Sequence, residues 1–92
     1  MKPSVARRYI VRGFVQGVGF RYFVQQIAVE LGVSGYVRNR DDGSVEVYAV
    51  ANEQLQARLA AYLRTGPRWA DVRHLDQQEA AMLKYEGFRV EP

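Results

Sequence analysis

Cysteine is absent from these 92 residues, and histidine occurs once, at His74. The lack of cysteine excludes disulfides, iron–sulfur clusters and thiol nucleophiles, and a small domain without disulfides is typical of a reducing compartment. A single histidine provides no histidine pair for a metal. No apolar stretch approaches the roughly 20 residues that span a membrane, and no signal peptide is visible. We therefore expect a cytoplasmic protein with no histidine-pair metal site and no membrane partner.

Acidic residues are fewer than basic ones, but only slightly. Lysine and arginine total 13 against 10 acids, which gives a formal charge of +3. This balance suits anionic partners and is too mild to indicate nucleic acid by itself. Apolar residues make up 48% of the chain, an ordinary globular share. At this length we expect one domain over residues 1–92 with one core, and a monomer is the simplest state.

Hydrophobic periodicity predicts strands alternating with helices. Alternation of apolar and polar residues is typical of strands. It predicts strands over residues 7–14, 35–40 and 44–51, and weaker patterns predict strands over residues 70–77 and 84–91. From Phe20 to Leu31 the apolar residues follow helical spacing, and Gly32 stands where a helix favours a C-terminal glycine.

A second helix is expected after Asn52, because asparagine is favoured at the N-cap position of helices. This helix is expected to end at Gly66-Pro67. Its apolar stripe is Leu55, Leu59, Tyr62 and Leu63. The order β-α-β-β-α-β points to an α+β, ferredoxin-like split-βαβ sandwich, in which two helices cover one face of an antiparallel sheet.

The register of the central hairpin can be predicted from its faces. A three-residue turn, Asp41-Asp42-Gly43, separates an apolar face from a polar and aromatic one. The pairs it predicts are Arg40 with Ser44, Asn39 with Val45, Arg38 with Glu46, Val37 with Val47 and Tyr36 with Tyr48. A two-residue turn would mix the faces, so we prefer the longer one.

The chemistry is expected in the loop before the first helix. Gly17 and Gly19 let successive backbone N–H groups converge on an anion, and the helix N-terminus adds unpaired donors. Arg21 in the first turn opposes the helix dipole, a cost that a bound anion would explain. The alternative is a tight connection with a surface arginine. The glycine spacing matches neither a Walker A loop nor a dinucleotide-binding fingerprint.

Several motifs together resemble those of the acylphosphatase family, over nearly the whole chain. They are Val15-Gln16-Gly17-Val18-Gly19-Phe20-Arg21, Gly35-Tyr36-Val37-Arg38-Asn39, Asp42-Gly43-Ser44-Val45-Glu46, Gly66-Pro67 and Tyr85-Glu86-Gly87-Phe88. The resemblance implies a ferredoxin-like sandwich that hydrolyses the carboxyl-phosphate bond of acyl phosphates without metal or cofactor. Inorganic phosphate would be its product and an inhibitor. Tyr36 departs from the family, which commonly has tryptophan there.

The same resemblance assigns roles to individual residues. Arg21 falls on the family's phosphate-binding arginine and Asn39 on its water-positioning asparagine. The phosphate-binding loop falls on Gln16, Gly17, Val18, Gly19, Phe20 and Arg21. Asn39 can reach this loop only if the first and second strands lie close at that end.

Other residues have simpler interpretations. His74 is expected on the surface or in a strand, and Trp69 in the core or at a sheet edge. Arg38 and Arg40 share a face with Tyr36 and Tyr48. That face is either a stacking platform for bases or a solvated surface with an Arg38–Glu46 pair.

Two rival functions therefore stay open. One is RNA binding through the sheet, and the other is a regulatory module that binds a small molecule without turnover. Activity on an acyl phosphate would separate acylphosphatase from both.

Overall fold

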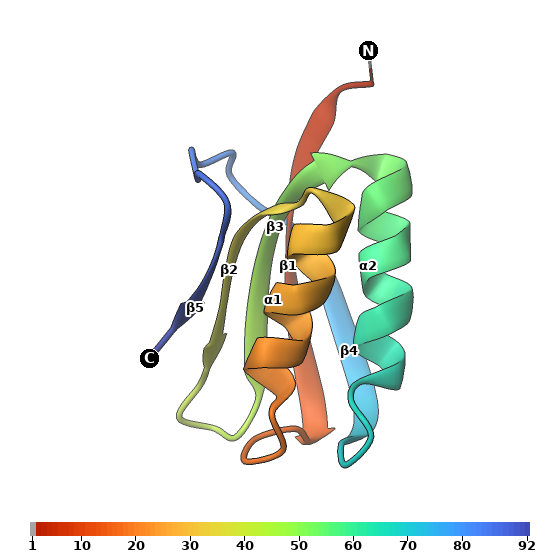
Figure 1. Cartoon of the computed structure of the whole chain (residues 1–92), viewed down its shortest axis with the longest axis vertical. Coiled ribbons are helices and arrows are strands. Elements are labelled where there is room, and N and C mark those ends of the chain that lie inside the picture. The colour runs from red at the N-terminus through yellow and green to blue at the C-terminus, as the bar shows by residue number, and fades with distance from the viewer. Residues whose placement is uncertain (1) are drawn as a thin grey trace.

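The structure, a computed structural model, describes residues 2–92. Over these residues the chain forms five strands and two helices (Figure 1). In chain order they are β1 (Ser4–Phe14), α1 (Phe20–Leu31), β2 (Ser34–Asn39), β3 (Val45–Asn52), α2 (Glu53–Thr65), β4 (Asp71–Glu79) and β5 (Phe88–Glu91). Each expected element is present, although β1 begins three residues earlier and β5 four residues later than its pattern predicts.

The strands form one sheet in the order β4-β1-β3-β2-β5. The four strands of the β-α-β-β-α-β unit pair antiparallel, as the sequence predicts for this ferredoxin-like α+β fold. β5 adds a parallel partner to β2, so the complete sheet is mixed. This added strand brings the C-terminal end of the chain alongside β2, which carries Asn39 (Figure 1).

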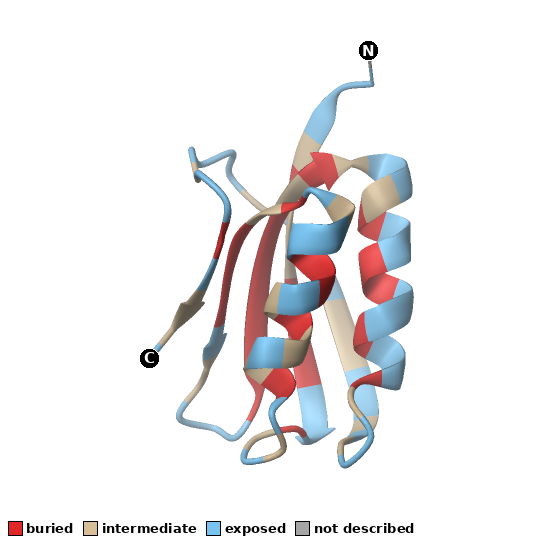
Figure 2. Cartoon of the chain, viewed as in Figure 1, coloured by how far each residue is buried: buried red, intermediate tan, exposed pale blue. Residues whose placement is uncertain are grey.

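Both helices lie on one face of the sheet, and the main core lies between the helices and the sheet (Figures 1 and 2). Its fully buried residues include Tyr9 and Val11 from β1, Val47 from β3, Val24 from α1 and Leu59 from α2. The helical stripe predicted from Phe20 is buried as expected, with Leu31 at its edge.

The opposite face is partly covered by the connection between β4 and β5. Tyr85 from this connection packs against Tyr36 and Tyr48, whose rings stack with centroids 5.6 Å apart. The Tyr48 hydroxyl donates to the Ala81 carbonyl at 2.6 Å and accepts from the Leu83 N–H at 2.7 Å. Tyr48 is 0% exposed. The two tyrosines therefore do not offer the exposed stacking platform that RNA binding through the sheet would require.

The hairpin between β2 and β3 has the predicted register. Val37 pairs with Val47, Tyr36 with Tyr48, Arg38 with Glu46 and Asn39 with Val45. Gly43 has a φ of 90°, and the Arg40 N–H donates to the Ser44 carbonyl at 2.9 Å across the turn. The longer of the two turns considered is therefore confirmed. This register places Asn39 at the last rung before the turn.

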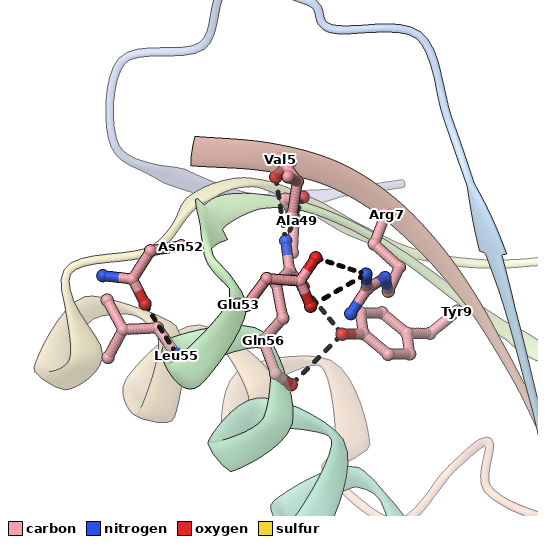
Figure 3. A network of polar contacts seen from close by, with 8 residues as sticks. All are labelled: Val5, Arg7, Tyr9, Ala49, Asn52, Glu53, Leu55 and Gln56. Atoms are coloured by element: carbon pink, nitrogen blue, oxygen red, sulfur yellow. Dashed lines mark hydrogen bonds and ion pairs between the residues drawn. The ribbon is translucent and has the colours of Figure 1, made fainter. Parts of the chain in front are cut away.

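Helix α2 confirms one prediction and corrects another. The Asn52 side chain accepts a hydrogen bond from the Leu55 N–H at 2.9 Å, so the predicted N-cap is confirmed (Figure 3). Tyr62, which was predicted on the buried stripe, is 44% exposed. The buried stripe instead contains Gln56, Leu59, Ala60 and Leu63, because helical spacing from Leu59 reaches Gln56 one turn earlier.

Gln56 is fully buried without an unpaired polar atom. Its side-chain N–H groups donate to the carbonyls of Val5 and Ala49 at 3.0 and 2.9 Å. Its side-chain oxygen accepts from the Tyr9 hydroxyl at 2.7 Å (Figure 3). These bonds fasten α2 to β1 and β3 at the end of the sheet opposite the loop that precedes α1 (Figure 1).

Candidate active site

The loop before α1 turns at two glycines and leaves backbone N–H groups without partners within the described part of the chain. Gly17 and Gly19 have φ values of 75° and 77°, in the left-handed region that favours glycine. Gly19 is the N-cap of α1 and no side chain caps the helix. Among residues 2–92, no carbonyl or side chain accepts a hydrogen bond from the N–H groups of residues 17–21. These donors are therefore available to a ligand.

Arg21 is held beside this loop from the other end of the chain. Its guanidinium donates to the Glu91 carbonyl at 2.9 Å, and the side chain is partly buried. One contact uses only part of the guanidinium, which carries five N–H donors. The contact depends on β5, because the parallel pairing of β5 with β2 brings Glu91 to this position.

Asn39 meets the loop in a hollow of about 140 Å³. The residues that line this hollow are Val15, Gly17, Gly19, Phe20, Arg21, Tyr22 and Asn39. The structure thus brings Arg21 and Asn39 together with three of the predicted loop residues. Gln16 and Val18 do not line the hollow, since Val18 packs against the core instead.

The Gln16 side chain points to the hairpin rather than into the hollow. Its N–H groups donate to the carbonyls of Arg40 and Ser44 at 2.8 and 2.9 Å. The family resemblance assigned Gln16 only to the phosphate-binding loop and gave its side chain no separate role.

The β2–β3 turn is itself held by short polar contacts. Asp42 accepts hydrogen bonds from the Ser44 hydroxyl and the Ser44 N–H at 2.5 and 3.0 Å. These bonds, with a further one from Arg12, lower the pKa of Asp42 to about 2. Asp42 therefore stabilises the turn that follows Asn39, as a turn aspartate does.

A larger hollow lies on the open face of the sheet. It has a volume of about 330 Å³, and Arg8, Arg38 and Arg40 are among the residues that line it. The buried Glu46 carboxylate lies 2.9 Å from Arg38 and 3.5 Å from Arg8, so it neutralises part of this charge. The Arg38–Glu46 pair that the sequence predicts is confirmed.

The remaining candidates lie outside the hollow that contains Arg21. His74 is exposed in β4 and contacts Asp76 at 2.9 Å. Trp69 is 72% exposed, with the Arg68 guanidinium 5.2 Å from its ring centre. Of the two places predicted for it, the core is wrong, and it lies just before β4, an edge strand of the sheet. Within the described residues, no three metal-ligating side chains come together. Neither helix of residues 2–92 has the length and apolar character needed to cross a membrane.

Comparison of the sequence and the fold with those of known proteins shows the family of this chain. The acylphosphatase family profile matches residues 7–90. The chain belongs to the acylphosphatase family. Its sequence is 56% identical over 90 residues to an acylphosphatase of Solibacter usitatus, which covers 98% of this chain and 94% of that protein.

Solved acylphosphatase structures share the fold over nearly the full length. The acylphosphatase of Coxiella burnetii matches with a TM-score of 0.93 at 34% identity, covering 97% of this chain and 94% of that one. The Bacillus subtilis acylphosphatase matches with a TM-score of 0.91 at 36% identity, covering 96% and 99%. These matches establish the family and the fold of this chain.

Sequence reasoning missed two features in or beside this hollow. Tyr22 lines the hollow although it is 68% exposed, and helical periodicity gives it no special place on α1. The role of the Gln16 side chain was also missed, because its partners are backbone carbonyls 24 and 28 residues away. Only a predicted hairpin beside the loop could have indicated that contact.

Proposed function

We propose that this chain is an acylphosphatase, which hydrolyses acyl phosphates to a carboxylate and inorganic phosphate. The observation that carries the proposal is the hollow in which unpaired loop N–H groups, Arg21 and Asn39 come together, in a chain of this family. Phosphoryl oxygens would lie against the N–H groups of residues 17–21 and the Arg21 guanidinium. A planar guanidinium and converging amides are the donors that such oxyanions favour.

The chemistry of the substrate fits so small a site. In an acyl phosphate the leaving group is a carboxylate, a weak base that departs with the electron pair of the broken P–O bond and needs no strong acid. Catalysis can then rest on positioning and on stabilisation of charge at the phosphoryl oxygens. Asn39 would orient the attacking water with its side-chain amide. Since asparagine cannot keep a proton, the water proton would pass to a phosphoryl oxygen.

The proposal extends to the form in which the enzyme works. We propose a single acylphosphatase domain over residues 1–92 that acts as a cytoplasmic monomer. It needs neither metal nor cofactor, because the carboxylate leaves without Lewis-acid help. Turnover of benzoyl phosphate should therefore be unchanged in excess EDTA.

Two substitutions test the separate roles of Arg21 and Asn39. Arg21→Ala should abolish most phosphate binding and turnover. Asn39→Ala should lower kcat by about 10²–10³, the usual cost of one oriented polar group, while phosphate affinity changes much less. Benzoyl phosphate hydrolysis gives kcat, and isothermal titration with phosphate gives the affinity. Arg58→Ala, which removes an exposed arginine on α2, serves as the control.

Three results would contradict the proposal. If wild-type protein binds phosphate without turnover, the regulatory-module alternative gains support. If Asn39→Ala keeps full kcat, Asn39 does not orient the water. If Arg21→Ala binds phosphate as well as Arg58→Ala does, the anion lies elsewhere.

A further inference from the structure

The polar links between the phosphate-binding loop and the strand that carries Asn39 are few. Val15 and Phe20 are buried at either end of the loop, and Gly17 and Gly19 between them are exposed. Glycine at two of four intervening positions leaves this backbone unusually free. Between Val15 and Phe20, Gln16 is the one described residue whose side chain donates hydrogen bonds to the rest of the protein.

Those two hydrogen bonds end beside Asn39. The Arg40 carbonyl belongs to the residue after Asn39, and the Ser44 carbonyl to the residue before Val45, the partner of Asn39 in β3. Gln16 itself precedes Gly17, which lines the hollow with Asn39. Both ends of the link are thus one residue from a group that faces the hollow.

We propose that Gln16 is a positioning residue, which sets the distance between the phosphoryl group in the loop and the water held by Asn39. This inference rests on the proposed acylphosphatase function. The hairpin does not need Gln16 to keep its place, because Val11 of β1 pairs with Val45 and Arg12 contacts Asp42 at 3.3 Å. Loss of the link would therefore shift the loop relative to Asn39, while the loop amides and Arg21 still bind phosphate.

Gln16→Met tests this, because methionine has a similar length and no N–H donor. Displacement of a reacting group by about 1 Å can cost up to 10²-fold in rate. We therefore expect kcat for benzoyl phosphate to fall about ten- to a hundredfold, with the phosphate dissociation constant changed by less than about threefold. Gln25→Met is the matched control, since the partly buried Gln25 side chain also donates to a backbone carbonyl, that of Phe88 at 3.3 Å. It should keep kcat within about twofold of wild type.

A double-mutant cycle shows whether Gln16 acts through Asn39. In the Asn39→Ala background, Gln16→Met should lower kcat by less than about twofold, because there is no water-orienting side chain left to misplace. Gln16→Asn, which keeps the amide on a shorter side chain that cannot span both carbonyls, carries the same test if Gln16→Met does not fold.

The outcomes separate this inference from the proposed function. Absence of wild-type turnover would overturn the proposed function and this inference with it. Normal wild-type turnover, with kcat of Gln16→Met equal to that of Gln25→Met, would overturn the inference alone. So would a full multiplicative loss in the double variant, or a loss of phosphate affinity as large as the loss of kcat.

Discussion

At the scale of single residues, Gln16 and Gln56 use the same contact in two places. Each donates both side-chain N–H groups to two backbone carbonyls. Gln56 holds α2 against the sheet, and Gln16 holds the loop before α1 against the hairpin. Apolar periodicity cannot identify such residues, because it treats glutamine as a surface residue. Its position could still have indicated that Gln56 is buried, because it lies three, four and seven residues before Leu59, Ala60 and Leu63 and so shares their face of α2.

Replacement of Gln56 by alanine should be strongly destabilising. It leaves a cavity, removes the nearer acceptor of the buried Tyr9 hydroxyl and leaves the Val5 and Ala49 carbonyls without their side-chain donor. We therefore expect a loss of about 2–4 kcal/mol in the free energy of unfolding. Urea denaturation measures this loss. Gln26→Ala, at an exposed position on α1, should change stability by less than about 0.5 kcal/mol. Equal stability of the two variants would contradict the role given to the Gln56 contacts.

At the scale of elements, local signals predicted both helices and all five strands, although the patterns for β4 and β5 were weaker. The turn at Gly43 and the N-cap at Asn52 depend on residues close in the chain, so both can be predicted from the sequence. The parallel pairing of β5 with β2 depends on the path of the connection across the open face, where Tyr48 binds residues 81 and 83. Such long-range packing leaves no periodic pattern, and neither does the Arg21 contact with Glu91 that follows from it.

The N-cap of α2 can be tested apart from catalysis. Asn52→Ala removes the acceptor of the Leu55 N–H, so we expect a loss of about 1 kcal/mol in stability. Asn52→Asp keeps an acceptor and should restore most of it. Since α2, which Asn52 caps, begins at the end of the molecule away from the loop before α1 (Figure 1), kcat of both variants should match wild type. A large drop in kcat for folded Asn52→Ala would contradict this separation.

At the scale of the whole molecule, the sheet separates two polar regions. The hollow with Arg21 and Asn39 lies at one end of the helix-covered side, and Glu46 lies on the open face among arginines. Burial opposes ionisation of Glu46, but hydrogen bonds from Tyr36 and Arg38 and the charges of Arg38 and Arg8 outweigh it. They lower its pKa below the usual value. Burial, together with the bond to Glu46, raises the pKa of Tyr36 to about 12.

Because of this network, the stability of the protein should depend on pH in the acidic range. A carboxylate whose pKa is lowered on folding stabilises the protein above its unfolded pKa, about 4.3 for glutamate, and that stability is lost as the pH falls through the folded pKa. We expect the free energy of unfolding to fall between about pH 5 and pH 3. The fall should be smaller in Glu46→Gln than in Glu30→Gln, which changes an exposed residue of α1. Parallel curves for the two variants in urea unfolding would contradict this assignment.

The central claim is that the loop amides and Arg21 together bind a tetrahedral oxyanion. The most direct measurement is titration of the ¹⁵N-labelled protein with inorganic phosphate, followed by amide chemical shifts. We predict saturable shifts at Gly17, Gly19, Phe20 and Arg21 that are lost in Arg21→Ala. Shifts confined to Arg8, Arg38 and Arg40 on the open face, with the loop amides unmoved, would contradict the account.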